Sequence, residues 1–243
     1  MSVQVSIVRQ SRLSTADRTS MIELHARYFS HVRRDRFLAD LAEKDWVIWL
    51  SDAGRLAGFS TQRLMTIRHR DRDRFVLFSG DTIVDRAYWG EHELAGAFGH
   101  LVLRLMREHG EGDLYWFLIT KGYRTYRFLP VFFNRFWPTP SAPDDHGLPD
   151  LLMMIARARY GSSFDEARGV IVAAEDSDRL RPEMCDVPPS RRRDAFVTFF
   201  LERNPGFASG DELACLAELR RDNLNQHAWR VISRTSPVWV DET

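Results

Sequence analysis

Lysine is scarce in this 243-residue chain: Lys44 and Lys121 are the only two, and the other 32 basic residues are arginines. We interpret this imbalance as the codon bias of a GC-rich bacterial genome. The 34 acidic residues balance the 34 basic ones, so the formal net charge is zero. That balance argues against a nucleic-acid-binding protein, because such a protein gains most of its affinity by neutralising phosphates.

Cysteine is scarce as well, and long apolar runs are missing. Cys185 and Cys215 are too few and too isolated for a disulfide framework or a cysteine metal site. The eight histidines lack the spacing of zinc ligands, so no metal site is expected. No stretch is long enough to span a bilayer, and the first ten residues lack the apolar run of a signal peptide. We therefore expect a soluble, cytoplasmic protein with no membrane partner.

Strand and helix patterns alternate through the first 137 residues. Segments rich in β-branched and aromatic residues, joined by short turns, predict an antiparallel meander at 45–51, 56–68 and 74–84. A strand at 3–8 and two helices precede the meander, and the first helix begins at Ser14 with Asp17 as its capping-box partner. After the meander, the sequence predicts a helix at 91–108, a strand at 113–120 and a helix at 123–133.

Residues 138–243 are predicted to be a C-terminal extension of this core. Their first part, 138–149, holds four prolines and predicts a linker-like loop. Mixed elements follow, with helices expected at 150–159, 192–203 and 211–224 and strands at 169–173 and 228–232. The extension either supplies the last strands of the sheet, covers an acceptor site, or mediates homodimerisation, and the residues do not decide between these alternatives.

The order strand, two helices, three antiparallel strands, helix, strand, helix resembles the GCN5-related N-acetyltransferase family over residues 3–137. The resemblance implies an α+β fold, acyl-CoA N-acyltransferase-like, in which helices flank a mixed, mostly antiparallel sheet. Residues 1–137 would form the acyltransferase-like core. Strands 74–84 and 113–120 would splay apart and offer backbone groups to the pantetheine arm of an acyl thioester. The helix at 91–108 would offer its N-terminus to the pyrophosphate.

The phosphate-binding loop of that family has the pattern Arg/Gln-x-x-Gly-x-Gly/Ala, but residues 86–95 are RAYWGEHELA here. Arg86 and Gly90 are one residue too far apart, and no second glycine follows. Glu91 and Glu93 would repel a pyrophosphate, although acids in a first turn also stabilise a helix. The segment is therefore either a plain helix start or a phosphate site built from other side chains, Arg86 or His92. Donor contacts are expected from Ile83, Val84, Arg86, Trp89, Gly90, His92 and Tyr123.

Two residues are candidates for catalysis. Asp81 follows a glycine inside an apolar strand, where glycine predicts a bulge or a close backbone approach. We place Asp81 on one face with Phe75, Leu77, Ser79 and Ile83, where its pKa would be raised and suit a general base. A buried hydrogen bond or a loop cap is the structural alternative. In the family a tyrosine on helix 123–133 often protonates the departing thiolate, and Tyr126 fits by spacing, with Tyr123 second. Core packing of the ring is the alternative.

These features predict an N-acyltransferase that moves an acyl group to an amine of a small molecule or a protein. Acetyl-CoA, another acyl-CoA or an acyl-carrier protein would be the donor, and the degraded phosphate loop favours a carrier protein or an unusual acyl-CoA. The alternative is a non-catalytic protein of the same fold that binds a ligand or a partner. A third hypothesis, nucleic-acid binding through arginines at 68–74 and 191–193, is opposed by the compensating acids.

Overall fold

The computed structural model describes residues 3–141 and 147–241. The first half of the chain follows the order of elements predicted from its sequence. Ser14 accepts a hydrogen bond from the Asp17 N–H (3.1 Å), which confirms the predicted capping box. The elements are β1 (Val3–Arg9), η1 (Gln10–Arg12), α1 (Thr15–Tyr28), β2 (Phe29–Ser30), α2 (Arg34–Ala42), β3 (Trp46–Asp52), β4 (Arg55–His69), β5 (Arg72–Val84), η2 (Arg86–Tyr88), α3 (Glu93–His109), β6 (Leu114–Thr120), α4 (Tyr123–Tyr126) and α5 (Phe128–Phe132).

The second half mixes short strands with helices. Residues 142–146 of the expected linker lie outside the described residues. The expected helices at 150–159 and 192–203 are confirmed. The elements are α6 (Leu148–Tyr160), η3 (Gly161–Ser163), β7 (Phe164–Asp165), β8 (Val170–Ile171), β9 (Arg179–Leu180), α7 (Pro182–Cys185), η4 (Arg191–Arg193), α8 (Ala195–Arg203), η5 (Phe207–Ser209), β10 (Glu212–Glu218), η6 (Arg221–Asn223), α9 (Gln226–Arg234) and β11 (Val238–Val240).

Two predictions for this half are wrong. The helix expected at 211–224 is strand β10, and the strand expected at 228–232 belongs to helix α9. Residues 213–217 of β10 are all buried, because β10 lies between two other strands with helices over both faces. This packing overrides the helix propensity of its leucines and alanines. Helix α9 is set by Asn225, whose side chain accepts a hydrogen bond from the Ala228 N–H (3.0 Å).

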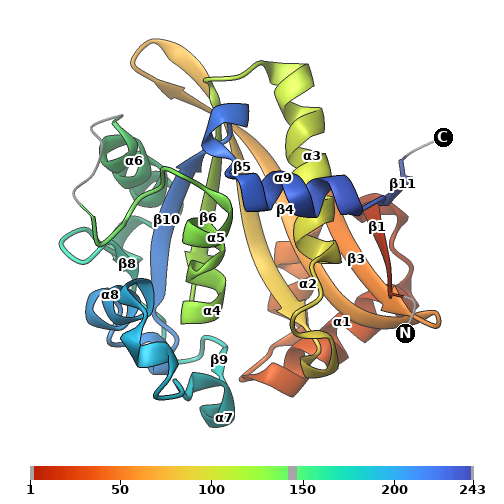
Figure 1. The fold of residues 1–243 in the computed structure, drawn as a ribbon. Coiled ribbons are helices and arrows are strands. Elements are labelled where there is room, and N and C mark those ends of the chain that lie inside the picture. The colour runs from red at the N-terminus through yellow and green to blue at the C-terminus, as the bar shows by residue number, and fades with distance from the viewer. Residues whose placement is uncertain (1–2, 142–146, 242–243) are drawn as a thin grey trace.

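Within the described residues, nine strands form one sheet in the order β11-β1-β3-β4-β5-β6-β10-β8-β7, and β2 pairs with β9 separately. Only β1–β11 and β5–β6 are parallel among the eight neighbouring pairs. Helices α3 and α9 cross one face of this sheet, and α1 and α2 lie behind it (Figure 1). The predicted α+β fold, with a mixed and mostly antiparallel sheet between helices, is confirmed.

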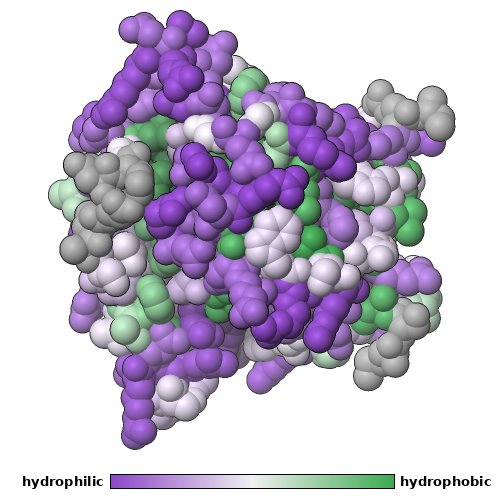
Figure 2. All heavy atoms as spheres, turned by 45° about the horizontal axis from the view of Figure 1, so that its top comes forward, coloured by the Kyte–Doolittle hydropathy of each residue, from purple (hydrophilic) through white to green (hydrophobic). Residues whose placement is uncertain are grey.

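Each face of the sheet has its own core. Leu77 and Trp116 point to the face covered by α3, α9 and the α4–α5 segment. Phe78 and Phe117 point to the opposite face, where α6 packs, and Phe59 joins α1 and α2 there. None of the helices within residues 3–141 and 147–241 is long and apolar enough to cross a membrane. Hydrophilic residues predominate on the surface shown in Figure 2.

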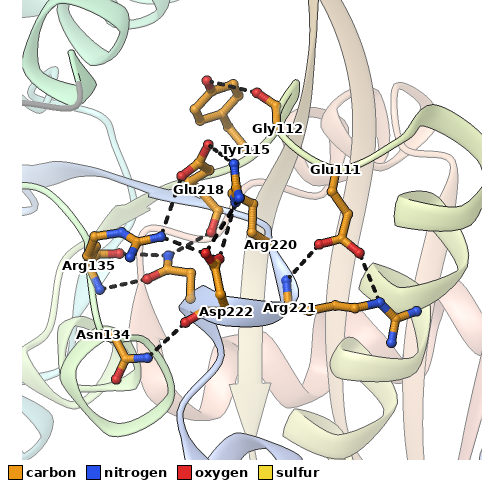
Figure 3. A network of polar contacts seen from close by, with 10 residues as sticks. Glu111, Gly112, Tyr115, Asn134, Arg135, Glu218, Arg220, Arg221 and Asp222 are labelled. Atoms are coloured by element: carbon orange, nitrogen blue, oxygen red, sulfur yellow. Dashed lines mark hydrogen bonds and ion pairs between the residues drawn. The ribbon is translucent and has the colours of Figure 1, made fainter.

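A polar network fixes the segment between β10 and α9 (Figure 3). Glu111, after α3, accepts hydrogen bonds from the backbone N–H (3.1 Å) and the guanidinium (2.9 Å) of Arg221. The buried Asn223 accepts from the Arg135 N–H (2.7 Å) and donates to the Glu218 carbonyl (2.7 Å). These contacts hold the start of α9 against the end of the sheet.

From there α9 crosses α3 at two glycines. A Cβ on Gly96 would collide with Thr235, and one on Gly99 would collide with Ile232. The Nε2 atom of His100 also lies 2.8 Å from the Thr235 carbonyl oxygen. The close approach of α9 to α3 therefore requires glycine at both positions, and α9 covers this side of α3.

Candidate functional site

Strands β5 and β6 form a fork. They pair in parallel from Phe75 with Leu114 to Ser79 with Leu118, and the described strands show no pair beyond that point, although β5 continues to Val84. The backbone edge of residues 80–84 that faces β6 is therefore left without a strand partner. Backbone groups in such a position must bind water or a ligand.

The fork opens at a β-bulge. The register of β4 against β5 shifts between Ser60 and Gln62, so that residues 80–81 of β5 oppose the single residue Thr61. A bulge bends its strand and disrupts the local ladder, which is what separates β5 from β6 here. The bulge predicted from the glycine is confirmed.

The extra residue also changes which side chains share a face. Leu77 and Ser79 face α3, as does Phe75, whereas Ile83 packs with α1 and α2. Asp81 lies on the α1/α2 face too, because the charged groups that act on its carboxylate include His25 of α1 and Asp40 of α2. The prediction that Asp81 shares a face with Phe75, Leu77 and Ser79 is therefore wrong.

A cavity of about 60 Å³ lies on the α3 face of the fork. The fork, α3, the α4–α5 segment and α9 form its walls, which include Ile119, Phe98, Phe133 and Ile232. Most of the lining is apolar, and its polar side chains gather near the bulge. We call this space the fork cavity, and its lining suits a short part of a ligand that is mostly apolar with a few polar groups.

A chain of hydrogen bonds runs along the wall of the fork cavity. The Trp116 indole N–H donates to Ser79 Oγ (2.8 Å), Ser79 donates to Gln62 Oε1 (2.7 Å), and Gln62 Nε2 donates to Ser60 Oγ (2.7 Å). The hydroxyl oxygens of Ser60 and Thr82 are 2.6 Å apart. Because an indole nitrogen can only donate, the direction of the chain is fixed, and one of the last two hydroxyls keeps a proton for a ligand. Sequence reasoning missed this chain, whose signal was the run of three polar residues at 60–62 in the middle of β4, all of them buried in the structure.

On the α1/α2 face, charged side chains surround the open end of the fork. Lys121 Nζ lies 3.0 Å from Asp178 Oδ1 and 3.6 Å from Glu212 Oε1, and His25 Nε2 lies 3.2 Å from Asp178 Oδ2. Asp81 interacts electrostatically with both His25 and Lys121. We call these five residues the charged cluster. Sequence reasoning found only Asp81 among them, because the other four are remote in the chain.

The charged cluster has perturbed proton affinities. Burial raises the pKa of Asp81, which the charge of His25 partly opposes, and burial also raises the pKa of Glu212. Burial alone would raise the pKa of Asp178, but His25 and Lys121 beside it hold that pKa well below its usual range. Burial opposes the charge on Lys121, but the carboxylates of Glu212 and Asp178 outweigh it and raise the pKa of the ammonium.

Asp81 is the member of the charged cluster best suited to chemistry. Its carboxylate accepts no hydrogen bond from any residue in the described part of the chain, and it is partly exposed at the open fork. A carboxylate with a raised pKa and free lone pairs can remove a proton from an amine.

Trp89 stands at the mouth of the fork and is 39% exposed. Its indole N–H donates to the Val84 carbonyl (3.0 Å), and the guanidinium carbons of Arg86 and Arg124 lie 5.6 and 4.8 Å from its ring centroid. Arg124 belongs to α4 and so reaches across the mouth from the β6 side. The structure thus brings three of the expected donor residues together and adds Arg124.

The other expected donor residues are more dispersed. Gly90 is exposed with a φ of +104°, and His92 precedes the first turn of α3 with its ring 5.8 Å from that of His227. Tyr123 is buried at the start of α4. The Ile83 side chain packs in the α1/α2 core, so only its backbone faces the fork.

Tyr126 lies apart from both the fork cavity and the charged cluster. It is fully buried against Phe136, Phe199 and Phe200, and its hydroxyl donates to the Pro138 carbonyl (2.8 Å). Burial raises the pKa of this phenol strongly. The predicted role of Tyr126 as the acid for the thiolate gains no support from this placement. No group of three or more His, Cys, Asp or Glu side chains in residues 3–141 and 147–241 is arranged to hold a metal ion.

No protein-family model and no curated protein matches the chain. Solved structures with a similar fold include a "Probable N-Acyltransferase" of unknown function from Enterococcus faecalis V583, with 13% identity over 56% of this chain and 33% of that one and a TM-score of 0.43. A GCN5-related N-acetyltransferase from Kribbella flavida has 12% identity over 55% of this chain and 34% of its own, with a TM-score of 0.40.

The ribosomal-protein-S18-alanine N-acetyltransferase from Escherichia coli has 17% identity over 56% of this chain and 86% of its own, with a TM-score of 0.38. The chain spans about a third of the Enterococcus and Kribbella proteins. Likeness at this level concerns the backbone arrangement and not the activity. The order of elements in the structure is the one that the sequence resemblance implies.

Proposed function

We propose that the protein transfers an acyl group from a thioester to an amine. The supporting observation is the fork at residues 80–81, with an apolar cavity on one face of the sheet and the Asp81 carboxylate on the other. In acyl transfer, the donor and the acceptor must reach one carbonyl carbon from different sides. Two ligands bound on opposite faces of the fork meet in its gap, which holds the reacting atoms in position.

The donor is an acyl thioester, most simply acetyl-CoA, whose pantetheine arm runs along the open fork with a part of it in the fork cavity. The unpaired backbone of residues 80–84 and the spare hydroxyl of Ser60 or Thr82 would bind its amide groups. At the mouth of the fork, Arg86 and Arg124 supply the cations for a phosphate, in place of the missing glycine-rich loop. An acyl-carrier protein presents the same arm and phosphate, so it is the alternative donor.

The charged cluster supplies the chemistry on the acceptor side. As the amine nitrogen attacks the thioester carbon, Asp81 removes a proton from the nitrogen, and backbone N–H groups of the bulge stabilise the carbonyl oxygen. The carbon–sulfur bond then breaks, and the thiolate takes up the proton held by Asp81, which gives an amide and a thiol. We expect an acceptor amine, from a small molecule or a protein, to approach over α1 and α2. The charged cluster holds three carboxyl groups and two basic groups, a balance that favours the positive charge of an approaching amine.

The test combines binding with turnover. Thermal unfolding is measured with acetyl-CoA, longer acyl-CoAs and free CoA, since a ligand at about one hundred times its Kd adds about 2.7 kcal/mol of stability. Thiol release is then followed with a panel of amines, with Asp81→Asn as the matched variant. A stabilising acyl-CoA and amine-dependent thiol release that Asp81→Asn abolishes are expected. If neither acyl-CoA nor acyl-carrier protein binds, the proposal is wrong.

A non-catalytic binding protein of the same fold is the second candidate. It is favoured by Glu93 in the first turn of α3, one of whose carboxyl oxygens is buried with no hydrogen-bond partner in the described part of the chain. An acid in that position opposes a diphosphate at the helix N-terminus. This candidate predicts ligand-induced stabilisation without thiol release for any amine.

A further inference from the structure

Both lysines of the chain lie at the fork, on the α1/α2 face. Lys121 belongs to the charged cluster, and Lys44 lies between α2 and β3 with its side chain 0% exposed. All other basic residues are arginines, most of them at least partly exposed. Codon bias does not explain why the two exceptions share one site. A compact ammonium fits into a narrow buried space, whereas a planar guanidinium is too wide for it.

The Lys44 ammonium has donors to spare. Its Nζ atom donates to Asp40 Oδ1 (2.6 Å) and lies 4.9 Å from the centroid of the Phe78 ring. An ammonium carries three N–H donors, and Asp40 is its one hydrogen-bond acceptor among residues 3–141 and 147–241. Two donors therefore remain inside the protein without an acceptor, an arrangement that is costly unless a ligand supplies one.

The spare donors lie beside the bulge. A Cβ placed on Gly80 would lie 2.8 Å from Lys44 Cε, 3.2 Å from Lys44 Nζ and 2.7 Å from Thr61 Oγ1. The Thr61 hydroxyl is buried and has no hydrogen-bond partner in the described part of the chain. The absence of a side chain at Gly80 thus lets the ammonium and the hydroxyl lie directly against the backbone of the bulge, where any side chain would displace them. We call Lys44, Thr61 and Gly80 the cradle.

We propose that the cradle binds the carbonyl oxygen of the thioester while that oxygen carries negative charge, which makes Lys44 a further catalytic residue. The inference rests on the acyl transfer proposed above. When the amine attacks, the carbon–nitrogen bond forms and the C=O electron pair moves to the oxygen. When the carbon–sulfur bond breaks, the pair returns to the carbonyl and the thiolate leaves, protonated by Asp81. An ammonium fixed in place by Asp40 stabilises this passing charge without reorganisation.

Two variants test the cradle in different ways. Lys44→Met removes the charge, whereas Gly80→Ala keeps the lysine and pushes its ammonium away from the bulge with a methyl group. Each should lower kcat and kcat/KM together by about 100- to 1,000-fold, the loss typical for one oxyanion donor, with the KM for the donor unchanged. Because both variants remove one interaction, the double variant should be no worse than Lys44→Met alone.

Gly122→Ala is the matched control, since its Cβ would make only an ordinary contact with Leu180 Cδ1 (3.6 Å), and it should keep kcat within about twofold of wild type. Thermal unfolding of every variant checks the fold, and Gly80→Ala carries the test if Lys44→Met does not fold. A wild-type kcat in Gly80→Ala, a rise in KM alone, or additive losses in the double variant would overturn the role of Lys44 and leave acyl transfer standing. A wild-type protein that releases no thiol with any donor and amine would overturn both.

Discussion

Filling the fork cavity should make the protein more stable and at the same time unable to bind its donor. Ala228 of α9 lines the cavity and is 3% exposed, and leucine at this position adds three carbon atoms. At about 24 cal/mol per Å³, filling all of the 60 Å³ would gain about 1.4 kcal/mol. Imperfect fit reduces this gain, so Ala228→Leu should raise the free energy of unfolding by about 0.5 to 1 kcal/mol.

Urea unfolding measures the gain, and thermal unfolding should show a Tm rise of about 2–4 °C per kcal/mol for a chain of this size. The same thermal assay with acyl-CoA should lose the ligand-induced shift, because leucine takes the space into which a part of the pantetheine arm must enter. Ala158→Leu, at an exposed position of α6, is the control and should change neither property. An Ala228→Leu protein that binds acyl-CoA like wild type would refute the assignment of the cavity to the donor.

Three further predictions concern the residues around the site. Asp81→Asn should lower kcat about 100- to 10,000-fold. Burial raises the pKa of Asp81 in the folded state, so the stability of the wild type falls as pH rises through that pKa. Urea unfolding should therefore show Asp81→Asn to be more stable relative to wild type at neutral pH than in acid. Tyr126→Phe loses the hydrogen bond to Pro138 and should cost about 1 kcal/mol in the same assay with turnover retained. A more than tenfold loss of turnover would support its role as the acid. Gly99→Ala should cost about 1–3 kcal/mol by colliding with Ile232, and an unaltered unfolding curve would contradict the packing of α9.

Local signals in the sequence were sufficient for the first half of the fold. The capping box at Ser14, the period of the long helix and the short turns of the meander each depend on residues close together in the chain. The glycine within Ser79–Thr82 also marked the bulge correctly. Such features form through contacts between near neighbours, so the sequence displays them directly.

The errors arise where distant segments decide the outcome. Apart from one cysteine, the residues of β10 are leucine, alanine and glutamate, which favour a helix on their own, and only burial between β6 and β8 makes them a strand. The face of the sheet on which Asp81 lies could not be predicted from the sequence either, because it depends on how β4 pairs with β5 at the bulge. Period-two alternation fails at a bulge, and the shift is visible only in the register.

The charged cluster shows the same limit in the site. His25, Lys121, Asp178 and Glu212 come from four separate parts of the chain, and nothing in their spacing links them. The scarcity of lysine was the one visible signal, and codon bias was a sufficient explanation until Lys44 and Lys121 proved to lie at one fork. The scarcity of lysine was therefore related to the site, but this relation could be recognised only once the fold had placed both lysines together.

One inserted residue in β5 accounts for much of the chemistry that the site can perform. In an uninterrupted strand, Asp81 would alternate onto the face of Leu77 and Ser79 and put a carboxylate into the cavity proposed for an anionic donor. The bulge turns Asp81 toward Lys121 and His25 instead, while hydroxyl groups remain on the cavity side. The same bulge ends the pairing with β6 and opens the gap between the two faces. An apolar environment for the thioester and a charged one for the amine thus meet across a single strand.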